Sequence, residues 1–348
     1  MSISIKGIEK FIIDRTLISI TKKRFNENGL CEFIKNLKKV GVDFFEIDET
    51  TFNFIEPLIT SKDIIFRVDE ISQLQICKAR GIEYILIKEE DIEFIKICDV
   101  QENNNFKIIV EINVDSSVSD YMQKINENID INRLFSVRFK GESNWFFDDY
   151  IKKHYIEDKY NVKININASD EFSMATAVGF QGLTLGIESI TTAFCGRDGT
   201  HGTTALEELL IATKIIMGEK VNGELSLLSE MRKQYEEITY INVPNNKPVI
   251  GRDIFKYESG VHVAGIEKNP ITYEPFMPEL VGMKRKLALG KHSGKNSIYS
   301  KLNELNMDNK FSAFEILGIL GRVKNISISN KTEVSDRDFI EICRKIKG

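Results

Sequence analysis

A chain of 348 residues that is 42% hydrophobic and 28% charged is typical of a soluble globular protein. Its net charge of −5 argues against general nucleic-acid binding, which needs a basic patch. The N-terminus lacks the apolar core of a signal peptide, and no apolar run is long enough to span a membrane. Five scattered cysteines without a Cys-x-x-Cys pair predict free thiols and a cytoplasmic location.

Short apolar runs alternate with helix-length patterns along the first two thirds of the chain. Each run is brief and rich in Ile, Val and Phe, as buried parallel strands are. The predicted strands are Lys10–Leu17, Phe44–Ile47, Ile64–Val68, Tyr84–Ile87, Phe106–Ile112, Leu134–Arg138, Val162–Ile166 and Gly186–Thr191. Eight strands with helices between them predict an α/β fold, a (β/α)8 TIM barrel, rather than an open two-faced sheet.

Helical periodicity fills the gaps between these strands. Glu27–Val40 repeats apolar residues at intervals of three and four, and Ile71–Arg80 and Val118–Ile129 behave in the same way. A helix over Ala205–Met217 would close the barrel. No Gly-x-Gly-x-x-Gly follows the first strand, so the sequence does not support dinucleotide binding.

The last third of the chain departs from this alternation. Val221–Thr239 is predicted to be one more helix, and the polar, proline-containing linker Asn242–Pro248 follows it. Further helices are expected at Phe311–Val323 and Asp336–Ile346, with a connection at Ile326–Asn330. This part of the sequence therefore predicts a small region of turns followed by helices.

We expect two domains, a barrel over residues 1–220 and a second domain over 221–348 that joins a small linker subdomain to C-terminal helices. Two of the four histidines, His262 and His292, lie in the second domain on turns rich in Gly and Ser. Such turns let the backbone approach a ligand closely, and a His can exchange a proton at neutral pH. Taken alone, both histidines fit a structural role better.

Five separated blocks surround these two histidines. They are Asn246–Gly251, Glu258–His262, Lys268–Phe276, Pro278–Gly282 and Gly290–Gly294. In this order and spacing they resemble the linker and subdomain of the 2-isopropylmalate synthase and homocitrate synthase family. The similarity is greatest to the homocitrate synthases of nitrogen fixation. The resemblance implies a metal-dependent (β/α)8 barrel that condenses acetyl-CoA with a 2-oxo acid.

The first barrel strand matches the family's pattern only in part. The family reads Asp-Thr-Thr-Leu-Arg-Asp there, and Asp14, Thr16 and Leu17 agree with it. Ile18 stands at the place of the catalytic Arg, and Ser19 at that of the acidic residue after it. An Ile cannot make the bidentate contact that an Arg makes to a carboxylate.

The family's other metal ligands are also replaced. Asn167 and Ser169 stand where the family has two histidines on one strand, and Thr203 stands where it has an asparagine. The resemblance leaves Asp14 as a residual ligand. One carboxylate without imidazole partners does not make a divalent-metal site. We therefore expect no metal cofactor on this chain alone.

Other residues close by in the sequence offer a way to rebuild such a site. Asp170, Glu171, Asp198 and His201 lie near the carboxyl ends of predicted strands, where barrel enzymes place their active sites. Acidic residues and His on a loop before a helix are more often solvated or capping groups. A rebuilt metal site is therefore the weaker alternative.

The chain keeps the segment that the family donates to a partner and lacks the residues used in its own barrel. This division resembles the omega-type subunit of a split homocitrate synthase, whose alpha-type partner carries the divalent metal. The resemblance implies that His262 is the catalytic residue donated in trans, with Tyr273 and Glu258 binding substrate. It implies acetyl-CoA and 2-oxoglutarate as substrates, and homocitrate for the nitrogenase iron–molybdenum cofactor as the product.

Three alternatives stay open. The chain could be a non-catalytic regulatory or scaffolding subunit with a dead barrel. It could condense a different 2-oxo acid, as 2-isopropylmalate and citramalate synthases do. It could also act independently through rebuilt chemistry at Asp170, Glu171, Asp198 and His201. Retention of Glu258–His262 argues against a mere scaffold, and His292 fits a structural turn better than a catalytic role.

Overall fold

The computed structural model describes residues 3–93, 105–113, 118–141, 162–199, 201–259, 262, 265–266, 268–307 and 311–347. The chain divides into two compact units, Met1–Val243 and Pro244–Gly348, and each is described by itself. Within the described ranges, none of the helices is long and apolar enough to cross a membrane.

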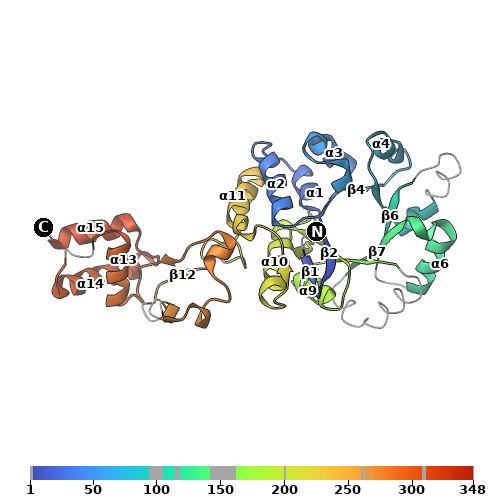
Figure 1. Cartoon of the computed structure of the whole chain (residues 1–348). Coiled ribbons are helices and arrows are strands. Elements are labelled where there is room, and N and C mark those ends of the chain that lie inside the picture. Colours follow the sequence, from blue (N-terminus) through green and yellow to red (C-terminus); the bar gives the residue numbers. More distant parts are fainter. Residues whose placement is uncertain are drawn as a thin grey trace. The chain divides into compact units, whose positions relative to one another are not determined.

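The first unit is a barrel of eight parallel strands, which confirms the predicted fold class (Figure 1). Each strand pairs with the next, and the last pairs with the first through contacts such as Ile12 with Ile190, so the ring is closed. The strands are β2 (Ile8–Asp14), β3 (Phe44–Ile47), β4 (Ile64–Arg67), β5 (Tyr84–Lys88), β6 (Lys107–Asn113), β7 (Leu134–Gly141), β8 (Ile164–Ala168) and β9 (Ser189–Ala193).

Three short strands complete the sheet. β1 (Ile3–Ile5) forms an antiparallel hairpin with β2, and β11 (Lys220–Val221) pairs with β1. The hairpin turn is Lys6-Gly7, and both residues have positive φ, as the tight turns that match the twist of paired strands require. β10 (Thr204–Ala205) pairs beside β9 in the parallel direction.

One predicted strand ends earlier than expected. Lys10–Leu17 was expected to be extended throughout, but β2 ends at Asp14 and helix α1 (Thr16–Thr21) begins two residues later. The Asp14 carboxylate accepts the N–H of Thr16 at 2.9 Å, and this bond turns the chain into the helix. Ile18 and Ser19 therefore lie on α1, not on a strand.

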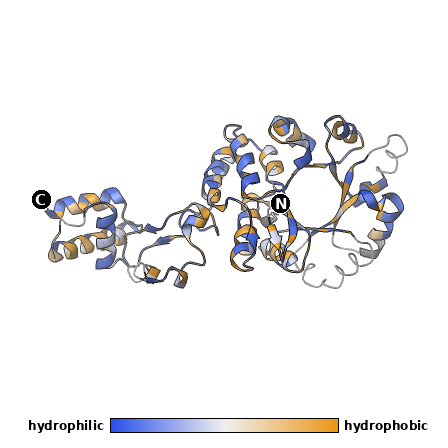
Figure 2. Cartoon of the chain, in the orientation of Figure 1, coloured by the Kyte–Doolittle hydropathy of each residue, from blue (hydrophilic) through white to orange (hydrophobic). Residues whose placement is uncertain are grey.

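Helices cover the outside of the barrel. They are α2 (Leu30–Val40), α3 (Glu49–Ile55), α4 (Gln73–Ala79), α6 (Val118–Asn128), α9 (Ala175–Thr184), α10 (Leu206–Ile215) and α11 (Leu228–Thr239). Their ribbons alternate hydrophobic and hydrophilic residues, as helices with one buried face do (Figure 2). The predicted helix Val221–Thr239 starts only at Leu228, because Val221 pairs in β11.

Helix α11 belongs to the barrel unit. The rings of Phe33 on α2 and Tyr235 on α11 lie 6.2 Å apart, and Asn36 donates to Gln234 at 3.1 Å. These contacts place the boundary between the units at Val243, later than residue 220, where the sequence alone placed it. The difference arises because the packing of α11 on α2 joins segments far apart in the sequence.

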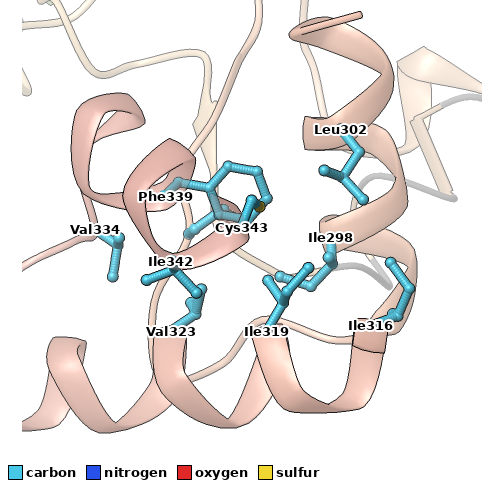
Figure 3. Packing of buried hydrophobic residues seen from close by; sticks show 10 residues of the cluster. Ile298, Leu302, Ile316, Ile319, Val323, Val334, Phe339, Ile342 and Cys343 are labelled. Carbon is cyan, nitrogen blue, oxygen red and sulfur yellow. The ribbon is translucent and has the colours of Figure 1, made fainter. Parts of the chain in front are cut away.

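The second unit begins with turns and ends in three helices. β12 (Lys256–Tyr257) and β13 (Lys286–Leu287) form a short parallel pair. The helices are α13 (Lys295–Glu304), α14 (Ala313–Asn330) and α15 (Asp336–Lys347). Buried side chains from all three helices, including Leu302, Ile319 and Phe339, form one hydrophobic core (Figure 3).

The predicted connection at Ile326–Asn330 was wrong, because these residues form the last turns of α14. The helix starts at a capping box made by Ser312 and Glu315. Its apolar period continues through Val323 and the partly buried Ile326, which pack on the same core. It ends where Lys331 adopts positive φ.

Candidate functional site

The inner faces of the barrel strands change from apolar to charged along their length. Ile13, Ile65, Leu86 and Ile109 meet in one buried cluster. Side chains alternate along a strand, so residues two positions later point the same way. Arg67 follows Ile65 in this manner, and Glu111 follows Ile109. Charged side chains therefore enter the barrel near the carboxyl ends of its strands, where barrel enzymes carry their sites.

A network of ion pairs fills this end of the barrel. Arg138 is fully buried, donates to Glu46, and places Nη1 3.4 Å from Oε2 of Glu111. Arg67 donates to Glu111 at 2.8 Å and lies 3.5 Å from Glu46. Arg15 Nε lies 3.6 Å from the same Glu46 carboxylate. Three guanidinium groups thus converge on two buried carboxylates.

The arginines of this network keep its two carboxylates ionised. Burial alone would raise the pKa of Glu46, but Arg138, Arg15 and Arg67 outweigh burial and hold that pKa below its usual range. Burial likewise opposes ionisation of Glu111, yet Arg67 and Arg138 lower its pKa strongly. Both carboxylates are therefore ionised at neutral pH, and each faces more than one cation.

Two positions at which the family resemblance predicts metal ligands are hydrogen-bonded to each other. Thr203 Oγ1 donates to Asn167 Oδ1 at 3.0 Å, and both side chains are buried. Ser169 donates its backbone N–H to Gly141. Neutral amide and hydroxyl groups hold a transition metal poorly compared with imidazole. This donor set does not fit a divalent-metal site.

Asp14 lies at the base of the same region. It is fully buried, accepts a hydrogen bond from Thr16 at 2.9 Å, and lies 3.4 Å from the Thr192 hydroxyl. Burial raises the pKa of Asp14 to about 7. Ile18 is buried on α1, and Ser19 Oγ donates to the Thr16 carbonyl. In the described part of the chain, His, Cys, Asp and Glu residues form no group of three that could hold a metal ion.

The residues that could have rebuilt a metal site serve separate local roles. Asp170 accepts the N–H of Ala175 at 3.0 Å. His201 is exposed and pairs with Glu171 across 3.2 Å. Asp198 lies 3.2 Å from Arg15 and so joins the buried network. Asp170, Asp198 and His201 nonetheless line one cavity at the carboxyl end of the barrel, and Glu171 pairs with His201 there.

In the second unit, two of the predicted site residues are neighbours. The rings of His262 and Tyr273 lie 4.9 Å apart, and both side chains are exposed. Ile271 and Met277 close by are 82% and 46% exposed. His262 thus lies exposed beside Tyr273, and large apolar side chains that follow in the sequence are exposed as well.

Glu258, the other residue predicted to bind substrate, makes a hydrogen bond within the second unit. Its carboxylate accepts the backbone N–H of His292 at 2.8 Å. A Cβ on Gly290 would approach Oε1 of Glu258 to 2.5 Å, so a larger residue there would displace this carboxylate. Glu258 therefore ties the Gly290–Gly294 turn to the His262 segment, and His292 contributes its backbone.

Glu274, which follows Tyr273 in the sequence, is a buried carboxylate that the sequence analysis did not single out. Glu274 is 2% exposed and accepts two hydrogen bonds from Arg285, at 2.8 and 2.7 Å. It also accepts the hydroxyl of Tyr257 at 2.9 Å. This bidentate pair fixes the backbone on which Tyr273 stands. No spacing rule links Glu274 to Arg285, so their pairing was not visible in the sequence.

The charged barrel residues were also missed, although the sequence contained a signal. Glu46, Arg67, Glu111 and Arg138 lie within or at the end of runs that were predicted to be buried strands. Charged residues are almost never fully buried unless they are paired. Four of them in buried strands therefore indicated an internal ion-pair network.

Comparison with known proteins gives a consistent assignment for the whole chain. Residues 249–331 match the family described as "Homocitrate synthase post-HMGL domain-like". The chain is 34% identical to the "Homocitrate synthase, omega subunit" of Clostridium pasteurianum over 351 aligned residues, which cover 99% of this chain and 98% of that protein. It is 28% identical to the 2-isopropylmalate synthase of Methanocaldococcus jannaschii over 76% of this chain and 51% of that protein.

Solved structures agree on the barrel. A hydroxymethylglutaryl-CoA lyase from Pseudomonas aeruginosa matches 68% of this chain and 94% of its own with a TM-score of 0.53 at 10% identity. An HMG-CoA lyase from Bacillus subtilis matches with a TM-score of 0.51 at 14% identity and similar coverage. At these identities the similarity concerns the fold alone.

Proposed function

Because the chain belongs to the homocitrate synthase and 2-isopropylmalate synthase family, we propose that it is an omega-type subunit of a homocitrate synthase. It condenses acetyl-CoA with 2-oxoglutarate only together with an alpha-type subunit. The observation that carries this proposal is the end-to-end similarity to an omega subunit, combined with a barrel whose metal-ligand positions are Asn167, Ser169 and Thr203. We further propose that its product, homocitrate, serves nitrogenase cofactor synthesis.

The interior of the barrel supports a non-catalytic role for this chain's own barrel. The ion pairs of Glu46 with Arg138, Arg67 and Arg15 lie inside the barrel toward the carboxyl ends of its strands, the end at which barrel enzymes bind their substrates. Removing one partner of a buried ion pair leaves an unpaired charge, which costs several kcal/mol. A substrate that displaced these pairs would meet that penalty. The metal site and the substrate arginine are therefore assigned to the alpha-type partner.

The contribution of this chain is the exposed His262 segment. In the condensation, a base takes a proton from the acetyl-CoA methyl group, and the resulting enolate carbon bonds to the ketone carbon of 2-oxoglutarate. The ketone oxygen then takes up a proton, and water cleaves the thioester to release CoA and homocitrate. An imidazole titrates near neutrality, so His262 can hold or pass one of these protons at the partner's site. When bound in the partner, the metal polarises the ketone oxygen.

Mixing experiments test this proposal. The purified chain, an alpha-type homologue and their mixture are assayed for CoA release with acetyl-CoA and 2-oxoglutarate. We expect turnover by the mixture and none by the single chain. Steady turnover by this chain alone would contradict the proposal. A partner-only activity that this chain merely modulates would favour a regulatory subunit.

The identity of the 2-oxo acid needs a separate comparison. Two relatives that are similar to parts of this chain have other names: the 2-isopropylmalate synthase above and the "Putative (R)-citramalate synthase CimA" of Archaeoglobus fulgidus. The same mixture is therefore assayed with 2-oxoglutarate, 2-oxoisovalerate and pyruvate. We expect the largest kcat/KM with 2-oxoglutarate. A preference for either of the other acids would assign the chain to the corresponding synthase.

A further inference from the structure

Helix α14 of the second unit buries only one of its sides. Ile319 and Val323 point from it toward α13 and α15 and are buried in the hydrophobic core (Figure 3). On the opposite side, residues at helical spacing stay exposed. Phe314 is 85% exposed, Ile328 59% and Leu317 47%. Three large apolar side chains therefore face solvent along one line of a single helix.

No charged side chain interrupts this apolar line on α14. Between Leu317 and Ile328 the helix carries charge only at Arg322 and Lys324. At 3.6 residues per turn, these two cations lie on opposite edges of the line rather than within it. The outward face of a solvated helix is normally polar or charged. An exposed, uncharged and apolar face of this length indicates contact with another protein surface.

Two glycines inside α14 are not required by the packing of the unit. Within the described part of the chain, a Cβ added at Gly321 would meet nothing within 4 Å, and one at Gly318 would touch only Ile346, at an ordinary 3.5 Å. A glycine inside a helix costs about 1 kcal/mol relative to alanine. A close approach by a second helix would explain both glycines, because two backbones can come together where side chains are missing.

A groove of about 440 Å³ borders the same face of α14. It lies between α14 and α15, and its lining includes the apolar side chains of Ile326 and Ile342. On α14 the groove extends from Arg322 to Asn330, which is C-terminal to Gly321. The exposed Phe314 ring lies N-terminal to Gly321. A projecting ring and a groove thus lie on the two sides of one glycine.

We propose that this face binds a second copy of the same chain, with the two α14 helices antiparallel and crossing at Gly321. Phe314 and Ile328 each lie seven residues from Gly321. A twofold axis at Gly321 therefore sets Phe314 of one copy beside Ile328 of the other, next to that copy's groove. The same contact forms twice. This inference concerns the single chain and does not depend on the proposed function.

The charges at the edges of the face favour the antiparallel direction. In a parallel pair, Arg322 of one copy would lie beside Lys324 of the other, at nearly the same height along the axis. In the antiparallel pair, Arg322 lies only about 7.5 Å along the axis from Glu315 of the other copy, on the same edge. Within one chain, no carboxylate of the described residues lies within 4.0 Å of the Arg322 guanidinium. A second copy thus supplies both a neutral apolar surface and an opposite charge.

Sedimentation velocity of the full-length chain tests the proposal. One helix pair lies near the lower end of interface sizes, at about 1,200 Å² or less, so we expect a Kd in the micromolar range. The mass should therefore double between about 1 and 100 μM. Phe314→Glu and Gly321→Glu should each raise this Kd about tenfold or more, because each places an unpaired charge in the interface. Gly321→Glu should also raise the melting temperature of the chain, since Glu is the better helix former.

A matched control and a rescue locate the contact. Ile216→Glu replaces an exposed apolar residue of the barrel unit and should change the Kd less than about twofold. Gly321→Lys should dissociate alone but associate when mixed with Gly321→Glu, because opposite charges then meet at the axis.

Three outcomes would overturn the proposal. The first is a wild-type chain that stays a monomer at about 100 μM. The second is wild-type self-association in folded Phe314→Glu and Gly321→Glu. The third is a mixture of the two Gly321 variants that stays dissociated.

Discussion

Thr203 donates a 3.0 Å hydrogen bond to Asn167, and the family resemblance leads us to expect metal ligands at these two positions. The bond satisfies the Thr203 hydroxyl and engages the Oδ1 atom of Asn167 inside the barrel. Neither group is an imidazole, and Ser169, the third replaced ligand, donates its backbone N–H to Gly141. The Asn167 Oδ1 and the Thr203 hydroxyl are thus engaged with each other, which leaves them less available to a metal, and metal binding can be measured.

The purified chain should contain no stoichiometric divalent metal. Asp14 is the residual ligand, and one carboxylate beside neutral amide and hydroxyl groups binds transition metals weakly. Elemental analysis of protein purified without chelators measures this. Near-stoichiometric zinc, manganese or iron that disappears in Asp14→Ala would show instead that the barrel holds a metal.

Glu46→Gln should destabilise the barrel by about 3–5 kcal/mol, because it leaves buried guanidinium groups without their shared carboxylate. Urea denaturation followed by circular dichroism measures the free energy of unfolding. Glu56→Gln is a matched control, since Glu56 pairs with Arg80 on the surface, and it should cost less than about 1 kcal/mol. Equal effects of the two substitutions would mean that the buried network does not stabilise the fold.

The same network predicts sensitivity to acid. Glu46 and Glu111 have pKa values lowered from an ordinary 4.5, so they lose protons more readily in the folded than in the unfolded chain. Below pH 4.5 the unfolded chain therefore binds more protons, and the free energy of unfolding falls as pH falls. Urea midpoints from pH 7 to pH 3 test this, and the acid slope should be shallower in Glu111→Gln. An identical slope in that variant would show that Glu111 does not contribute to the acid sensitivity.

His262→Ala should reduce the turnover of the mixed complex by roughly a hundred- to ten-thousand-fold while assembly survives, because a general acid–base group is lost. Turnover is measured by CoA release, and assembly by size-exclusion chromatography. His292→Ala is the control, since Glu258 accepts the backbone N–H of His292 rather than its ring. Full activity of His262→Ala, or a larger loss in His292→Ala, would show that His262 is not the donated catalytic residue.

Glu258 and Tyr273, two residues that the family resemblance singles out, differ in their surroundings. Both were expected to bind substrate. Tyr273 lies exposed beside His262, in a place where it can meet a partner's ligand. The Glu258 carboxylate accepts a backbone N–H from His292, 34 positions away in the sequence. The contacts of each side chain depend on the folded chain, which a linear motif does not encode, and the substrate-binding roles of both residues stay predictions.

The sequence by itself determined the barrel, because brief runs of Ile, Val and Phe at regular separation are compatible with few other folds. It also determined which family positions are missing, since replaced residues are visible without coordinates. Only the tertiary structure decided that Glu46 and Arg138, 92 residues apart, share a buried ion pair. It likewise decided that Asp170, Asp198 and His201 border one cavity. Closing a ring of strands brings such side chains together, and no local period in the chain records that approach.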